Sequence, residues 1–227
     1  MPTVFITGAN RGLGLEYARQ YADAGWRVVA TARSPEKAEA LRALGPRVTI
    51  HHLDVADLAA VAALGRELAA ETVDVLIANA GVFEAREMTA ATVPASATAW
   101  ERTFRVNAMA PLALAGAFHA QVARSEQRKI IAMTSRLGSM GANSDGGLYA
   151  YRSAKAALNA VWRSFALDHS DVIAVLLHPG WVRTDMGGAG ALLDPEASVA
   201  GLRRVIANLG PSDSGRFYNY DSSPIPW

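Results

Sequence analysis

The sequence predicts an α/β fold, in which a parallel sheet of about seven strands is covered by helices on both faces. Short runs rich in β-branched residues alternate with Ala- and Leu-rich segments of helical period along the 227 residues, and this alternation is typical of repeated strand–helix units. A glycine-rich segment directly after the first run supports the same fold, because such turns join a strand to a helix in nucleotide-binding sheets. No linker, repeat or low-complexity tract interrupts the pattern, so residues 1–227 are expected to form one domain.

The β-branched and helical runs place each element in order. Strands are expected near residues 2–7, 26–32, 47–53, 73–79, 128–134, 172–178 and 215–219, and helices near 12–24, 35–44, 56–70, 98–124, 150–168 and 195–209. The remaining long segments, 82–97 and 180–194, are predicted to be irregular. Long loops at the carboxyl edge of a sheet are usual binding elements, so the segment 180–194 is the expected substrate loop.

Several predicted helix boundaries carry local signals. Ser34 and Asp194 each precede a proline, which suits an N-cap followed by the first helical position. The segment 98–101 has the spacing of a capping box. Gly25 and Gly45 fall where a helix end requires a left-handed residue.

Composition excludes several classes of function. Lys and Arg total 22 against 21 Asp and Glu, so no strong field would attract nucleic acid or a membrane surface. The absence of cysteine excludes disulfides and thiolate chemistry. We found neither a signal-peptide pattern nor an apolar run long enough to span a bilayer, and we therefore expect a soluble, cytoplasmic protein.

The glycine turn after the first strand predicts a dinucleotide site. Gly8 permits a tight turn, and Gly12 and Gly14 let the backbone and the following helix approach a pyrophosphate. The spacing is G-x-x-x-G-x-G, and the residues between the glycines that we expect to contact the nucleotide are Asn10, Arg11 and Leu13. A glycine-rich connection without a ligand is the alternative.

The end of the second strand predicts which dinucleotide binds. An acidic residue here would suit the ribose 2′-hydroxyl of NAD, but this strand ends in Ala32 and Arg33. Arg33 and Arg11 together suit a 2′-phosphate, because guanidinium binds phosphate as a planar fork. We therefore expect NADP(H) rather than NAD(H), the alternative being two solvated arginines. After the third strand, Asp54 and Val55 are expected beside the adenine, although Asp54 could equally cap the next helix.

Tyr151 and Lys155 form the candidate catalytic pair. Carbonyl reduction requires a proton donor with a pKa near the working pH, and free tyrosine titrates near pKa 10. A lysine at i+4 lies on the same helix face and would lower that pKa, whereas Tyr149 has Ser153 at i+4. Ser135 follows the fifth predicted strand, where its hydroxyl is placed to polarise a substrate carbonyl. A surface Tyr/Lys contact is the alternative.

Asn107 is the fourth candidate. It lies within the predicted helix 98–124, and Pro111 follows at i+4 without an N–H to donate to the Asn107 carbonyl. A kink with a free carbonyl is therefore expected at this point, and that carbonyl could hold a water that relays protons to Lys155. A simple kink with a surface water is the alternative.

Along the whole chain these residues resemble the short-chain dehydrogenase/reductases, a superfamily of Rossmann-type doubly wound enzymes, and within it the C-factor and carbonyl-reductase-like branch. The motifs that carry the resemblance are Thr7-Gly8 with Gly12 and Gly14, Asn79-Ala80-Gly81, Asn107, Ser135, Tyr151 with Lys155, and Pro179-Gly180. The resemblance implies that Asn107, Ser135, Tyr151 and Lys155 are catalytic. It also implies that Asn79, Ala80 and Gly81 support the central sheet and the adenine ribose, and that Pro179, Gly180, Val182 and Thr184 flank the nicotinamide.

One departure from the family pattern concerns the substrate. Ser135 and Tyr151 lie sixteen residues apart, where thirteen is more usual, so we expect the glycine-containing loop between them to bulge. The side chains expected near the cleft are mostly apolar, and they are Phe83, Met88, Met140, Tyr149, Trp181 and Met186. They favour an uncharged aldehyde, ketone or quinone-like substrate, with Arg136 and Arg183 as the candidate cations for a charged one.

Two other functions remain open. An extended-branch epimerase could use the same Ser/Tyr/Lys set, but it needs a longer C-terminal region. A nucleotide-binding signalling protein of the C-factor type is the second alternative. No metal site is expected, because His51 and His52 face opposite sides of a strand, while His119, His169 and His178 are isolated in the sequence. The helices expected at 98–124 and 150–168 have Ala-rich faces that allow close packing, and the resemblance implies that two chains pair through them as a homodimer or homotetramer. Packing of the same alanines within the chain is the alternative.

Overall fold

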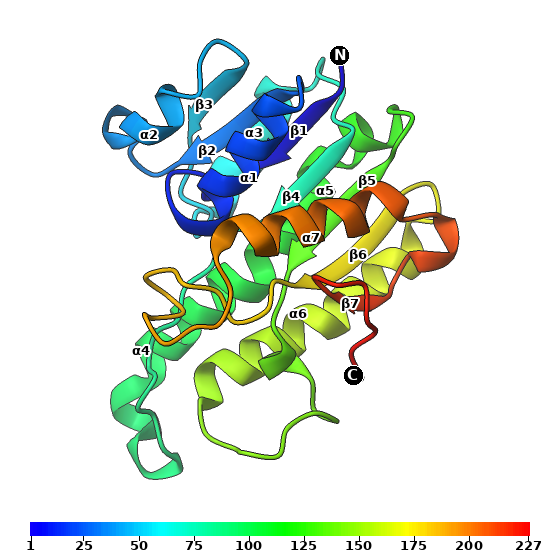
Figure 1. Ribbon diagram of the computed structural model, residues 1–227. Helices are drawn as coiled ribbons and strands as arrows, with labels where there is room; N and C mark the ends of the chain where they lie inside the picture. The colour runs from blue at the N-terminus through cyan, green and yellow to red at the C-terminus, as the bar shows by residue number, and fades with distance from the viewer.

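The computed structural model describes residues 1–227, and its centre is a seven-stranded parallel sheet. The strand order is β3-β2-β1-β4-β5-β6-β7 (Figure 1). The bounds are Thr3–Ile6 for β1, Arg27–Ala32 for β2, Val48–His52 for β3, Val75–Ala78 for β4, Lys129–Met133 for β5, Ile173–His178 for β6 and Phe217–Asn219 for β7. All seven predicted strands and the doubly wound fold class are confirmed.

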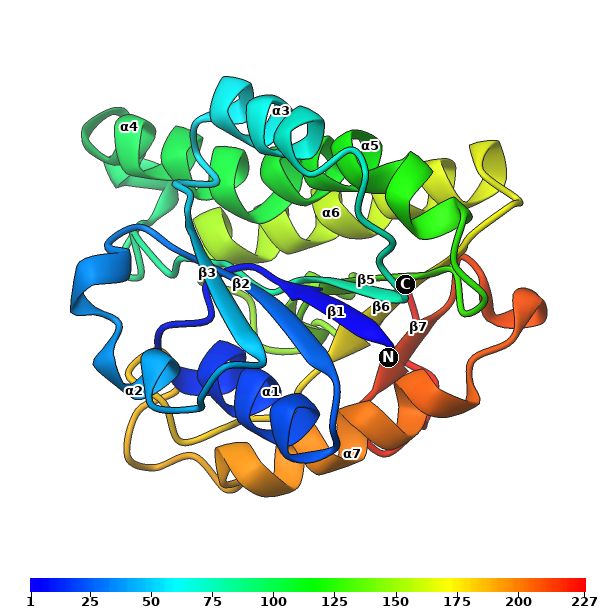
Figure 2. The ribbon, with the colours of Figure 1, turned by 90° about the horizontal axis from the view of Figure 1, so that it is seen from above.

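Helices cover both faces of this sheet, as Figure 2 shows. One face carries α1 (Gly12–Asp23), α2 (Glu39–Arg42) and α7 (Pro195–Asn208). The other carries α3 (Leu58–Glu67), α4 (Val93–Phe104), α5 (Ala110–Ala123) and α6 (Tyr149–Asp168). Short 3-10 turns lie at Pro35–Lys37, Ala90–Thr92, Arg136–Gly138 and Pro211–Asp213, and a π-helical turn spans Arg105–Met109. No helix of the structure combines the length and the apolar character needed to cross a bilayer.

The hydrophobic core forms two layers because successive strand residues point to opposite faces. In β1, Val4 and Ile6 belong to the cluster beneath α1 and α7, whereas Phe5 belongs to the cluster beneath α5 and α6. All three are fully buried, as expected for a parallel sheet covered on both sides.

The strand order reverses direction between β1 and β4, and this reversal positions the site. Chain connections leave β1 and β4 toward opposite sides of the sheet, so a crevice opens at their carboxyl ends. The glycine turn after β1 and the loop after β4 both lie there.

Several helix boundaries differ from the sequence prediction. The segment 35–44 is a 3-10 turn followed by the short α2, and α4 begins at Val93 inside the segment expected to be irregular. The capping box therefore lies at Thr89 and Thr92, not at 98–101, which is inside α4. The side chains of Ser34 and Asp194 do not cap their helices.

The glycines predicted at two helix ends are confirmed, whereas the cap predicted at Asp194 is not formed. Gly25 and Gly45 adopt φ of 81° and 90°, the left-handed conformation that the sequence predicted. Asp194 bonds the guanidinium of Arg183 at 2.9 Å, which explains why its carboxylate does not cap α7.

Candidate active site

The glycine turn closes tightly around the start of α1. Gly8 and Gly12 have positive φ values of 64° and 53°, which glycine adopts without strain. At Gly14 an added Cβ would lie 2.2 Å from the Gly8 carbonyl oxygen and 2.7 Å from the Asn79 amide nitrogen. The turn thus packs closely against the end of β4 and, with the side chains of Asn10, Arg11 and Leu13, borders a cavity of about 460 Å³ at the N-terminus of α1.

Thr7 and Asn79 hold this turn against the end of β4. The Asn79 side chain donates to the Thr7 carbonyl at 2.9 Å, and the Thr7 hydroxyl accepts from the backbone N–H groups of Asn79 and Ala80 at 3.0 and 3.1 Å. These bonds link β1 to β4 at the point where the strand order reverses. The sequence indicated Thr7 only as part of the glycine motif. Its position at the end of a strand was the one signal that it could link β1 to β4.

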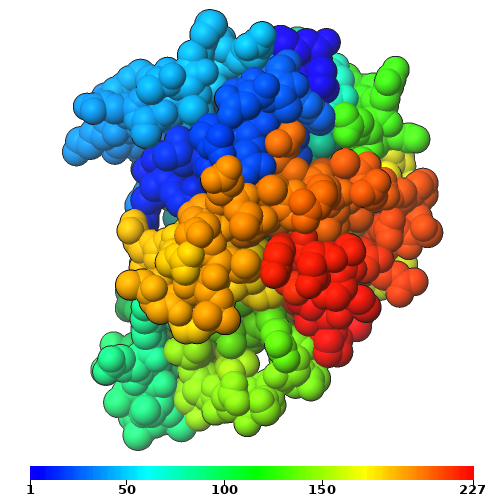
Figure 3. All heavy atoms as spheres, in the orientation of Figure 1, coloured from blue at the N-terminus to red at the C-terminus, as the bar shows by residue number.

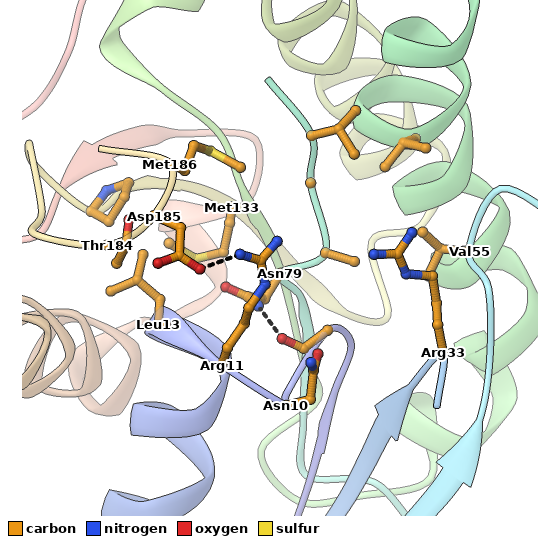
Figure 4. A pocket seen from close by; sticks show the side chains of 18 of the residues that line it. Asn10, Arg11, Leu13, Arg33, Val55, Asn79, Met133, Thr184, Asp185 and Met186 are labelled. Carbon is orange, nitrogen blue, oxygen red and sulfur yellow. Dashed lines mark hydrogen bonds and ion pairs between the residues drawn. The ribbon is translucent and has the colours of Figure 1, made fainter. Parts of the chain in front are cut away.

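The two arginines expected at the adenine end both line the cavity but lie on different sides of it. Figure 4 shows Arg11 joined to Asp185, with Arg33 across the pocket beside Val55. The Arg11–Asp185 ion pair is exposed, and such pairs contribute little to stability. Arg33 forms no hydrogen bond or ion pair within the chain, so its guanidinium is available to a ligand. Asp185 was not anticipated, since 174 residues separate it from Arg11.

Asp54 lines the cavity and does not cap α3. Its Oδ1 accepts from the Ala56 N–H at 3.0 Å, and the cap of α3 is Asp57, whose carboxylate accepts from Ala59 and Ala60. The capping alternative for Asp54 is therefore wrong. Its side chain and Val55 face the same cavity as Arg33.

Tyr151 and Lys155 lie on one face of α6 and are almost completely buried, with exposed fractions of 8% and 4%. The Lys155 ammonium nitrogen lies 5.8 Å from the centre of the Tyr151 ring and donates to the Met133 carbonyl at 2.8 Å. Burial raises the pKa of Tyr151 to about 12, with hydrogen bonding to Ser135 opposing the rise, and burial lowers the pKa of Lys155 to about 7. The expected lowering of the Tyr151 pKa by Lys155 is not seen, because desolvation is the main influence on this buried phenol.

Ser135 lies beside Tyr151 because the turn after β5 is held against α6 by a hydrogen bond of Thr134 and by the close approach of Gly138. The Ser135 Oγ accepts from the Leu137 N–H at 3.1 Å, which leaves its own O–H free to donate. Thr134 bonds Asn159 of α6 at 2.7 Å. A Cβ at Gly138 would lie 2.7 Å from the Lys155 backbone, so only glycine lets the turn and α6 approach this closely.

Asn107 is fully buried within the π-helical turn that interrupts the predicted helix. In that turn Ala110 donates to the Arg105 carbonyl, five residues back. The side chain of Asn107 bonds both backbone groups of Val82, with distances of 2.9 and 2.8 Å, and so fixes the loop that follows β4. A surface water at this point, the alternative considered from the sequence, does not fit a residue without exposed area.

The chain matches a known protein family over most of its length. The model of the short chain dehydrogenase family matches residues 2–191. The protein is a member of this family. Its resemblance to the C-factor and carbonyl-reductase-like branch is also confirmed by the individual relatives.

One relative of this short-chain dehydrogenase is the C-signal protein of Myxococcus xanthus, 45% identical over 157 residues, or 68% of this chain and 93% of that protein. The NADPH-bound carbonyl reductase from chicken fatty liver has a TM-score of 0.90 at 30% identity, covering 100% of this chain and 99% of the other. The carbonyl reductase of Pseudomonas aeruginosa PAO1, in complex with NADP, has a TM-score of 0.83 at 33% identity, covering 100% of both chains.

Two loops of this short-chain dehydrogenase cover the cleft above Tyr151. The Phe83 ring lies 4.5 Å from the Tyr151 ring, and the Arg86 guanidinium lies 4.2 Å above Phe83 and donates to the Met186 carbonyl at 3.1 Å. Arg86 thereby connects the loop after β4 to the segment 180–194, a contact between distant residues that could not be expected from the sequence. In Figure 3 that segment, coloured yellow to orange, lies between the blue N-terminal residues and the green residues around α4.

The nicotinamide-flanking residues predicted from the family lie at the start of the segment 180–194. Pro179 and Thr184 line the same cavity as Tyr151. The buried Ser198 hydroxyl donates to the Pro179 carbonyl at 2.6 Å, and the Thr184 Oγ1 accepts from the Gly187 N–H at 3.2 Å. Gly180 has a φ of 81° and packs against Tyr220. Val182 is buried and forms a bridge with Leu193.

The apolar side chains expected near the cleft divide into three groups. Phe83 packs on the Tyr151 ring, Met186 lines the same cavity as Tyr151, and Met88 is buried at 5% exposure. The other three are largely exposed, namely Met140, Tyr149 and Trp181. Of the two candidate cations, Arg183 lines the nucleotide cavity and pairs with Asp194, whereas Arg136 lines a second cavity with His178.

The expectation that the last three histidines are isolated is wrong for two of them. The rings of His119 and His169 lie 4.5 Å apart, and His119 contacts Asp171. The separation of fifty residues in the sequence conceals this contact, which depends on how the ends of α5 and α6 lie together.

Proposed function

We propose that this short-chain dehydrogenase reduces carbonyl compounds with NADPH. The observation that carries the proposal is that the buried Tyr151 and Lys155 line the same cavity as the glycine turn after β1. Two similar solved structures are carbonyl reductases with NADP or NADPH bound, which supports a reductase over a signalling protein of the C-factor type.

The residues fit the nucleotide. A side chain at Gly14 would collide with the Gly8 carbonyl oxygen, so glycine lets α1 begin close against the turn, where a pyrophosphate would gain both backbone N–H groups and the helix dipole. Lys155 uses one of its three N–H donors on Met133, so two remain for the ribose hydroxyls. Bound NADPH would supply the hydride.

The chain's own groups would handle the proton. Tyr151 would give its phenolic proton to the carbonyl oxygen as the hydride reaches the carbon. Ser135, whose O–H is free, would donate a hydrogen bond to the same oxygen. Lys155 in its charged form would stabilise the resulting phenolate, and the Asn107 turn would hold a water through which Lys155 recovers a proton.

The preference for NADP(H) rests on Arg33. It is the unpaired guanidinium at the end of β2, where no carboxylate competes for the ribose, and guanidinium binds phosphate as a fork. Arg11 would first have to leave Asp185. We expect Arg33→Gln to weaken NADPH binding at least tenfold and NADH binding less than threefold in a fluorescence titration. Equal losses for both nucleotides would contradict this assignment.

Turnover tests the function itself. Wild-type protein should oxidise NADPH in the presence of uncharged aldehydes, ketones or quinones, since the apolar Phe83 packs on the Tyr151 ring and Met186 lines the same cavity as Tyr151. Tyr151→Phe should lose turnover by roughly 10²–10⁴, the usual contribution of a general acid. Tyr149→Phe is the matched control on the same helix, because Tyr149 is half exposed and outside the cavity. Loss of activity in both variants would contradict the assignment.

Assembly is a separate proposal. Ala115 and Ala154 are buried in the chain's own core and Ala113 packs against that core, but on α6 Ala156 is only partly buried and Ala160 is exposed. We propose that this small-residue surface pairs two chains. Sedimentation equilibrium should show a dimer or tetramer, and Ala156→Arg should shift it toward monomer.

A further inference from the structure

Three potential metal ligands converge at the end of α6 that is remote from Tyr151. At 1.5 Å per residue, the eighteen residues from Tyr151 to His169 span about 27 Å along the helix axis. His119 comes from the last part of α5, His169 is the residue that ends α6, and Asp171 lies in the turn before β6. Figure 2 shows the ends of α5 and α6 together, on the same face of the sheet.

The three ligand atoms lie within 4.8 Å of one another. His119 Nε2 and Asp171 Oδ1 are 3.1 Å apart. Two ligands on a tetrahedral zinc ion are separated by about 3.3 Å, since each metal–ligand bond is about 2.0–2.1 Å. This pair therefore already has the required spacing, and the His169 nitrogen would need to approach by about 1.5 Å or less.

Aromatic packing holds both rings in place. Phe165 lies one helical turn before His169, with ring centres 4.4 Å apart, and meets the His119 ring edge-on at 6.5 Å. The His169 ring forms no hydrogen bond within the chain, so it has a nitrogen free for a metal. His119 and Asp171 have side-chain exposures of 25% and 52%, which leaves access for an ion and a coordination position for water.

The surroundings favour a cation. The C-terminal end of α6 carries unpaired backbone carbonyls and the negative end of the helix dipole. Two imidazoles and one carboxylate suit Zn²⁺ and similar transition metals, whereas Ca²⁺ and Mg²⁺ prefer oxygen ligands throughout.

We propose that His119, His169 and Asp171 form a Zn²⁺ site that fastens the end of α6 to α5. The site is separate from the proposed catalytic centre, and its role is structural. It would add a connection between the end of α6 and α5, on the face of the sheet opposite α1 and α7.

Zinc binding to the complete, tag-free chain tests this proposal. Calorimetric titration should show one saturable site per chain, and Co²⁺ as a probe should give the visible absorption of a nitrogen- and oxygen-ligated ion. Zinc at a hundred times its Kd should raise Tm by about 5–10 °C. His169→Gln and Asp171→Asn should each weaken binding at least tenfold and abolish that shift.

His51→Gln is the matched control. His51 also lies near a carboxylate, with Glu67 at 3.7 Å, but has no third ligand. It should bind zinc as the wild type does. An unchanged NADPH affinity in every variant would show that the fold is intact. The proposal is wrong if the wild type shows no saturable zinc binding, or if His169→Gln and Asp171→Asn bind zinc as tightly as the wild type.

Discussion

Replacing Lys155 by methionine should remove a specific dependence of stability on pH. Burial lowers the pKa of Lys155 from 10.5 to about 7 in the folded chain. Between these values the unfolded chain binds a proton at this residue and the folded chain does not. The free energy of unfolding therefore rises with pH, by about 1.4 kcal/mol per pH unit. Below pH 7 both states are protonated, and the dependence disappears.

From pH 7.5 to 9.0 the contribution of Lys155 amounts to about 2 kcal/mol. Lys155→Met keeps the unbranched apolar stem of the side chain but removes the ammonium group and its hydrogen bond to the Met133 carbonyl, at a roughly constant cost of about 1–3 kcal/mol. Because that cost does not change with pH, the informative quantity is the difference between the two stabilities at each pH.

Urea unfolding of the nucleotide-free protein measures this difference. The wild type should gain about 2 kcal/mol over Lys155→Met between pH 7.5 and 9.0. Lys37→Met, at an exposed lysine, should follow the wild-type slope. Parallel curves for wild type and Lys155→Met would refute the reasoning, since they would mean that Lys155 keeps the same proton in both states.

Three further predictions concern the glycine contacts and catalysis. Gly14→Ala should weaken NADPH binding at least tenfold in a fluorescence titration, because its Cβ would lie 2.2 Å from a backbone oxygen of the turn. The control Gly116→Ala, in open space on α5, should bind NADPH as the wild type does. Gly65→Ala should lower the free energy of unfolding by about 1–3 kcal/mol in urea, since its Cβ would meet the Ala117 carbonyl at 2.7 Å; equal stability would contradict this tight packing of α3 on α5. The kcat/KM for NADPH, which reports the free enzyme, should fall as pH rises through about 7 and Lys155 loses its charge; a flat profile from about pH 6 to 9 would exclude that role.

The sheet was predictable because its signal is local. A strand buried on both faces is a short apolar run, and turn or helix signals bound each of the seven runs. The start of α4 was predicted at residue 98 from the capping-box spacing, but the helix begins at Val93, and Pro94 in its first turn is the signal for that start. Pro111 correctly indicated an interruption near Asn107, but not that the chain would form a π-helical turn.

Contacts between distant segments were not predictable. The bond between Arg11 and Asp185 and the meeting of His119 with His169 depend on where loops and helix ends lie in space. The pKa of Tyr151 was misjudged for a related reason. Spacing along a helix shows that a lysine is near, but not how completely both groups are removed from water, and here desolvation dominates.

Transfer of a labelled hydride tests the proposed reduction most directly. NADPH deuterated at the transferable position of the nicotinamide would be incubated with the protein and an aldehyde, ketone or quinone that supports NADPH oxidation. The product would be analysed by mass spectrometry. We expect one deuterium on the carbinol carbon with wild-type protein and incorporation at least about a hundredfold slower with Tyr151→Phe, whose NADPH affinity should be preserved. Tight NADPH binding without deuterium transfer to any carbonyl compound would contradict it.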